Sequence, residues 1–146
     1  MSNINTNTLL GTLELISEET SNITFLQGQF HDMPFSIQVS TPIDFEKINF
    51  DFILDKLNNF IMLKDKAEKF LKNILITSPN SLGISSSEKI NGELVSFPEF
   101  IFGENNNWSI VFRDSPLPIA EPYGILINYQ NDNVIGFEDL SDAEEL

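Results

Sequence analysis

The chain has 146 residues, no cysteine, and 22 acidic against 8 basic residues, so its formal net charge is −14 at pH 7. This length, with 41% hydrophobic residues, predicts a single domain over residues 1–146 whose ends, 1–8 and 141–146, are frayed. The missing cysteine excludes disulfides and zinc–thiolate sites, and the scarcity of Lys and Arg argues against nucleic acid or an anionic membrane as a partner.

Three strands are predicted in the first forty residues, because apolar and polar side chains alternate there. The strands cover Leu9–Ile16, Ile23–Phe30 and Phe35–Ser40. Short polar segments, Glu18–Asn22 and His31–Pro34, separate them and have the composition of turns. The three strands are therefore expected to form an antiparallel meander.

A long helix is predicted over Phe50–Ile76, where apolar residues recur every three or four positions and charged residues occupy the opposite face. Asn49 is the expected N-cap, because an asparagine side chain accepts from the free N–H groups of a first helical turn. The apolar stripe shifts near Met62–Leu63, so one continuous helix and two helices with a kink at that point both fit the pattern.

The second half of the chain is interpreted as a loop, Ser78–Gly92, followed by about four strands. The expected strands are Leu94–Phe102, Trp108–Arg113, Tyr123–Tyr129 and Val134–Phe137. Pro98 lacks a backbone N–H, so we expect a bulge or a sheet edge at this position. The whole pattern predicts an α+β fold with a mainly antiparallel sheet: three strands, then one long or kinked helix packed on one face, then about four strands.

The negative charge is unevenly distributed along the chain. Segment 44–76 holds six acids and six lysines and is neutral, whereas the remainder holds 16 acids and only Lys89 and Arg113 as bases. A field of this sign favours association with a basic protein, because opposite charges steer the encounter. Solubility alone explains the same composition, and the sequence leaves both interpretations open.

Few residues invite a catalytic or metal-binding interpretation. His31, the one histidine, precedes Asp32, but no nucleophile can be linked to this pair, and an ordinary turn histidine explains it. One histidine without cysteine rules out a conventional multi-histidine zinc site. Asn131–Asn133 starts like a calcium loop, but the later ligand positions fail, so a hairpin turn is predicted. We therefore predict no catalytic residue, no metal site and no cofactor.

Thirteen phenylalanines stand against two tyrosines and one tryptophan. The simpler interpretation is a core packed with phenylalanine, because large apolar side chains are mostly buried. The alternative is that a few of these rings face a partner.

Three segments of the last third, Trp108–Asp114, Glu121–Tyr129 and Val134–Asp142, resemble the end of small acidic bacterial proteins of unknown function. Several families of that kind are associated with immunity to polymorphic toxins. The resemblance covers mainly residues 108–142, and its segments are strand patterns rather than catalytic signatures. It implies an inhibitory binding role and carries no functional residue over.

Acidity, size and this resemblance together predict a non-enzymatic binding protein, such as an immunity-type inhibitor that covers a basic toxin. A structural or adaptor domain acting through β-edge pairing or homodimerisation is the alternative, and a small enzyme comes third. The chain starts without a basic or apolar leader and has no long apolar run, so a cytoplasmic location is expected, while the oligomeric state stays open. The expected partner contacts are acids beside strand turns and in the tail: Glu104, Glu121, Asp132, Glu138 and Asp139.

Overall fold

The computed structural model describes residues 2–5, 12–17, 23–40, 45–84, 92–103 and 107–140. These residues form, in chain order, β1 (Ser2–Asn5), β2 (Thr12–Ser17), β3 (Ile23–Phe30), β4 (Met33–Ser40), η1 (Phe45–Lys47), α1 (Phe50–Asn58), α2 (Phe60–Thr77), η2 (Pro79–Leu82), β5 (Ser96–Phe102), β6 (Asn107–Asp114), η3 (Pro118–Ala120), β7 (Ile125–Gln130) and β8 (Asn133–Asp139). The fold is therefore α+β, as the sequence predicts, and in the chain the helices come between two groups of four strands.

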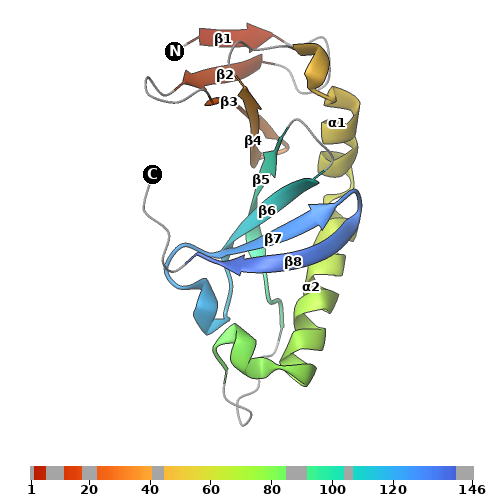
Figure 1. The fold of residues 1–146 in the computed structure, drawn as a ribbon, viewed down its shortest axis with the longest axis vertical. Helices are drawn as coiled ribbons and strands as arrows, with labels where there is room; N and C mark the ends of the chain where they lie inside the picture. Colours follow the sequence, from red (N-terminus) through yellow and green to blue (C-terminus); the bar gives the residue numbers. More distant parts are fainter. Residues whose placement is uncertain are drawn as a thin grey trace.

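The described strands form one eight-stranded sheet whose spatial order follows the chain from β1 to β8. Every neighbouring pair is antiparallel except β4 and β5, which are parallel and pair through Phe35 and Phe100. A parallel pair needs a crossover connection, and the helical segment supplies it. In Figure 1, α1 and α2 run along one side of the sheet, past both groups of strands. The predicted, mainly antiparallel sheet with its helical layer on one face is confirmed.

The N-terminal half has four strands rather than the predicted three. Ser2–Asn5, which we expected to be frayed, forms β1 and pairs with β2. β1 is an edge strand and is held by backbone hydrogen bonds, which every residue can make. Its sequence therefore needs no alternation of apolar and polar residues, and the sequence pattern did not reveal it. The predicted strand start at Leu9 and the predicted fraying of 141–146 fall outside the described residues.

The helical segment is broken at Asn59, three residues before the position at which we allowed for a kink. The Asn59 side chain donates to the Asp55 carbonyl at 2.7 Å and to the Asp55 carboxylate at 3.0 Å. Such local bonds compete with helical ones, which explains why the break falls here. At the other end, the Asn49 side chain accepts from the Phe52 N–H at 3.0 Å, so the predicted N-cap is confirmed.

The core lies between the helices and one face of the sheet. The buried helical residues Leu57 and Leu71 join one cluster with buried residues from both halves of the sheet. Of the phenylalanine side chains that the structure describes, five are buried, six are half-buried and Phe97 alone is exposed. A core packed with phenylalanine is therefore confirmed, and Phe97 stands apart from it.

Aromatic rings stack across the second half of the sheet. Trp108 lies 4.5 Å from Tyr129 and 5.4 Å from Phe102, between ring centroids. The buried Tyr129 hydroxyl donates to the Leu63 carbonyl of α2 at 2.8 Å, and burial raises the pKa of Tyr129. This stack joins strands β5, β6 and β7 to the helix.

Two tight turns confirm the sequence interpretation. His31 and Asp32 form the two-residue loop between β3 and β4, both with positive φ, as a type I′ hairpin requires. Asn131 and Asp132 form the two-residue loop between β7 and β8, in which Asn131 has a positive φ, and the Trp108 indole N–H donates to the Asn131 carbonyl at 2.8 Å. The single histidine therefore serves a turn, and the supposed calcium loop is a hairpin.

Glu68 on α2 departs from its predicted place on the solvent face of the helix. Its side chain is buried, and its carboxylate accepts from the backbone N–H groups of Leu94 and Val95. Helical spacing alone cannot reveal this, because the segment that closes over Glu68 comes from the chain just before β5. These hydrogen bonds position the segment that leads into β5, the first strand of the second group.

Candidate functional site

The helices pack on one face of the sheet, and along β2–β4 the side chains of the other face are mostly polar. Along β4, buried residues alternate with residues that point to the opposite side. The register aligns these outward residues across strands, because Glu14 lies opposite Gln27 and Gln27 lies opposite Ser36. We call this other face the open face.

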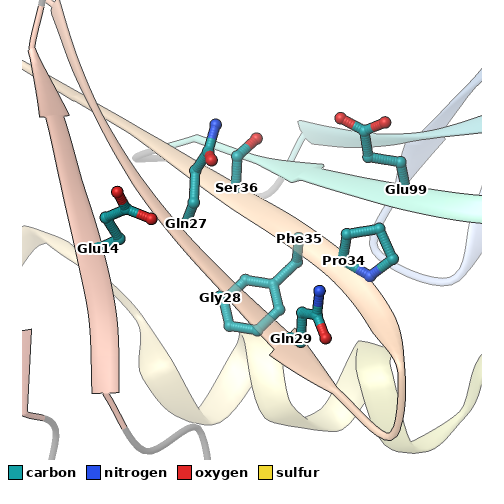
Figure 2. A pocket seen from close by; sticks show the side chains of 8 residues that line it. All are labelled: Glu14, Gln27, Gly28, Gln29, Pro34, Phe35, Ser36 and Glu99. Atoms are coloured by element: carbon teal, nitrogen blue, oxygen red, sulfur yellow. The ribbon is translucent and has the colours of Figure 1, made fainter.

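A groove of about 310 Å³ crosses the open face. Residues from four neighbouring strands, β2 to β5, line it (Figure 2): Glu14, Gln27, Gly28, Gln29, Pro34, Phe35, Ser36 and Glu99. Glu14 and Glu99 stand on its two sides, three strand spacings or about 14 Å apart across the sheet. Between them, side-chain amides and a hydroxyl offer donors and acceptors. The groove therefore suits a polar ligand that carries positive charge.

The floor of the groove depends on Gly28. This residue pairs with Phe35, whose buried ring lies 2.8 Å from the point that a Cβ at position 28 would occupy. The Leu13 side chain lies 2.7 Å from the same point. A side chain here would collide with both residues, so only glycine lets the Phe35 ring fill the space from the core side.

Glu99 is held in place by Arg113 of the neighbouring strand. The Arg113 Nε lies 2.9 Å and its Nη2 lies 2.8 Å from the Glu99 Oε2. The remaining nitrogen, Nη1, donates to the Tyr123 carbonyl at 3.2 Å. Arg113 thereby links the groove to the turn before β7 and balances one of the two groove carboxylates.

Charges in the described residues are segregated between the two layers. The helices α1 and α2 carry five lysines against four acids, so the helical layer has no excess of negative charge. Its lysines form two ion pairs within the layer, Lys56–Asp55 and Lys69–Asp65, and two with acids outside it, Lys56–Asp132 and Lys64–Glu93. The described strands contribute one cation, Arg113, which is already engaged by Glu99. Five carboxylates of the sheet and its turns have no ion pair within the described residues: Glu14, Asp32, Asp114, Glu121 and Glu138. The excess negative charge therefore belongs to the sheet.

Three of the five predicted contact residues come together at one end of the sheet. Glu138 and Asp139 end β8, whose last residues pair with the start of β7. Glu121 lies exposed in the turn just before β7. Asp114, at the end of β6, adds a carboxylate at the same end. Glu104, the fourth predicted contact, lies outside the described residues.

Asp132, the fifth, lies at the opposite end, in the turn between β7 and β8. Its carboxylate pairs with the buried Lys56, and Lys66 donates to its carbonyl at 2.8 Å. Burial by itself would lower the pKa of Lys56, but the hydrogen bonds and charges of Asp132 and Asp55 outweigh it, so this pKa is raised. Asp132 thus fastens the hairpin to the helices, and its carboxylate is not free to meet a partner.

The groove carboxylates were absent from the sequence-based set of contacts. A signal was present, because Glu14 and Glu99 each occupy the polar position between apolar neighbours in a strand. The missing information was the register of four strands, above all the parallel pairing of β4 with β5, which places these two residues on one groove.

Within the described ranges, no group of three or more His, Asp or Glu residues is arranged to hold a metal ion. None of the helices there combines the length and apolar composition of a membrane span. Comparison with protein-family models, curated proteins and solved structures yields no match. Function is therefore inferred from the charges and shape of the open face.

Proposed function

We propose that this protein is a non-enzymatic, acidic binding protein that holds a basic protein partner against its open face, as an immunity-type inhibitor holds a toxin. The observation that carries the proposal is the segregation of charge. The lysines of α1 and α2 outnumber the acids of these helices by five to four, whereas five carboxylates of the sheet and its turns have no ion pair within the described residues.

A surface of this kind acts first through its field. Uncompensated carboxylates on one side of a molecule raise the local concentration of a cationic partner and accelerate association at low salt. The groove then offers charged and amide groups at short range, with Glu14 on one side and Glu99 on the other. This arrangement requires no catalytic residue and no cofactor.

The alternative function, an adaptor that pairs through a sheet edge, is favoured by one observation. β8 is an outer strand of the sheet, and its Ile135 side chain is 56% exposed. An outer strand with an exposed apolar residue can accept a further strand, including one from a second copy of the chain.

The test compares two variants of equal net charge. Glu14→Lys, Glu121→Lys and Glu138→Lys together reverse the open face and its rim. Asp51→Lys, Asp55→Lys and Asp65→Lys reverse three exposed acids of the helices instead. Wild type and both variants are used to capture partners from the source cell's lysate, and association rates are then measured on what is captured.

We expect the open-face variant to associate with a captured basic protein at least tenfold more slowly than the helix variant. The difference should shrink as the Debye length falls from about 10 Å at 0.1 M salt to about 3 Å at 1 M. Equal rates for the two variants would mean that net charge alone matters. Capture of no basic protein would contradict the proposed function.

A further inference from the structure

Two rows of outward side chains border the groove of the open face. Glu14, Gln27 and Ser36 each directly follow a buried core residue in their strands, so their side chains point to the opposite face of the sheet. The register places these three in one row, with Gln27 between the other two (Figure 2). The second row consists of Gln29, Pro34 and Glu99. The backbone of Gly28 lies between the rows and forms the floor.

The two carboxylates of the groove differ in their partners. Glu99 is balanced from within the chain, because the Arg113 Nε and Nη2 lie 2.9 Å and 2.8 Å from the Glu99 Oε2. The half-buried Glu14 side chain, by contrast, has no hydrogen bond or ion pair within the described residues. The groove therefore carries one unbalanced negative charge, and this charge lies at its β2 end.

The neighbours of Glu14 determine which cation suits this end of the groove. The side chains of Gln27 and Ser36 also have no hydrogen bond in the part of the chain that the structure describes. Three adjacent strands, about 4.8 Å apart, thus offer a carboxylate, an amide oxygen and a hydroxyl oxygen. A lysine ammonium donates three hydrogen bonds from one point and matches three separate acceptors. Arginine instead presents a planar fork that matches one carboxylate, and Glu99 already has its arginine.

We propose that the groove binds one lysine side chain of the basic partner, with its ammonium against Glu14 and with Gln27 and Ser36 as further acceptors. This inference rests on the proposed function and names the residue type by which the partner is recognised. The lysine stem then lies over the Gly28 backbone, between the two rows. The groove volume of about 310 Å³ is at the lower end of the range for ligand sites, about 300–1,000 Å³, and suits a single side chain.

The experiment titrates a blocked five-residue peptide, one lysine among glycines, into the ¹⁵N-labelled full chain at low salt. The Gly28 backbone amide and the Gln27 side-chain amide report on the groove by NMR, and the same peptide with arginine in place of lysine tests the choice of cation. Glu14→Gln removes the charge and keeps the shape, and Ser36→Ala removes the hydroxyl. Asp51→Asn is the matched control, because it removes one exposed carboxylate of the helical layer and so changes the net charge equally.

We expect the lysine peptide to shift both groove signals and to bind more tightly than the arginine peptide. Glu14→Gln and Ser36→Ala should each weaken its binding about two- to fivefold, and Asp51→Asn should leave it unchanged. Binding to Glu14→Gln as tight as to wild type, or tighter binding of the arginine peptide, would overturn the proposal. Urea unfolding should give the same midpoint for Glu14→Gln and wild type. Should this midpoint fall, Ser36→Ala decides: weakened binding supports the site and unchanged binding refutes it.

A six-residue oligolysine peptide and the variant Glu121→Lys, Glu138→Lys, which leaves the groove intact, separate this inference from the proposed function. If the variant weakens oligolysine binding but the single-lysine peptide shifts no groove signal, the acidic surface stands and the lysine site is refuted. If the single-lysine peptide shifts the groove signals while the variant binds oligolysine as wild type does, the site stands and the charge argument fails. If neither peptide binds wild type, both are refuted.

Discussion

Glu68 gives the clearest test of how the helical layer holds the second half of the sheet. Its side chain is 8% exposed, and its two carboxylate oxygens each lie 2.9 Å from the Leu94 nitrogen, with one of them 3.0 Å from the Val95 nitrogen. Glu68→Ala removes the acceptor and leaves two buried N–H groups unsatisfied. At about 1–3 kcal/mol each, the free energy of unfolding should fall by about 2–6 kcal/mol.

Two further variants make the test specific. Glu68→Gln keeps one carbonyl oxygen as an acceptor, so we expect a loss of about 1–3 kcal/mol. Asp65→Ala, on the exposed side of the same helix, removes only the pairing with Lys69 and should cost less than about 0.5 kcal/mol. Urea unfolding measures all three values.

Amide hydrogen exchange at Leu94 and Val95 supplies the local measurement. Both amides should exchange faster in Glu68→Ala than in Asp65→Ala, beyond the change that lower global stability produces. Unchanged protection of both amides would show that the Glu68 carboxylate is not their acceptor. Equal stability of Glu68→Ala and Asp65→Ala would lead to the same conclusion.

Three other predictions concern the core and the response to pH. Leu71→Ala removes a fully buried side chain and should cost about 2–5 kcal/mol in urea unfolding; a loss below about 0.5 kcal/mol would mean that the buried face of α2 is assigned wrongly. Gly28→Ala forces a Cβ toward Leu13 and Phe35 and should cost about 1–3 kcal/mol, whereas an unchanged urea midpoint would show that both side chains move aside freely. Burial raises the pKa of the Tyr129 hydroxyl above its ordinary 10.0, so on raising the pH the unfolded chain loses the hydroxyl proton before the folded protein does. The free energy of unfolding should therefore fall as the pH rises above about 10. In thermal unfolding across a pH series, the melting temperature of Tyr129→Phe should fall less steeply above about pH 10 than that of wild type. A smaller fall should remain because the pKa of Lys56 is also raised. Identical curves for the two proteins would assign the loss of stability at high pH to another group.

The fold class could be predicted because burial on one side leaves a periodic trace in the sequence. Alternation marks most strands, and a spacing of three to four residues marks the helical segment. β1 leaves no such trace, since its polar residues are held by backbone pairing with β2. The break at Asn59 depends on side-chain bonds to Asp55, which compete with the helix without disturbing its apolar pattern.

The candidate site was harder to predict, because it depends on which charged side chains from distant parts of the chain lie next to one another in the fold. Helical spacing places Lys56 and Glu68 on the solvent face, yet the β7–β8 turn and the segment before β5 close over them. Asp132 looked like a free acid for the same reason. The exposure of Glu121 and Glu138 could be predicted from the local sequence, whereas the groove between Glu14 and Glu99 requires the register of distant strands.

The parallel pairing of β4 with β5 also has a consequence for how the chain folds. Every ladder in the sheet joins consecutive strands, and only β4 and β5 have the helical segment between them, so each group of four strands can form from contacts close in sequence. The pair through Phe35 and Phe100 closes a loop that contains the whole helical segment, and we expect it to form last. Until it forms, the first half of one molecule can accept the second half of another and make the same contacts in an exchanged dimer. The yield of monomer on refolding should therefore fall as the protein concentration rises.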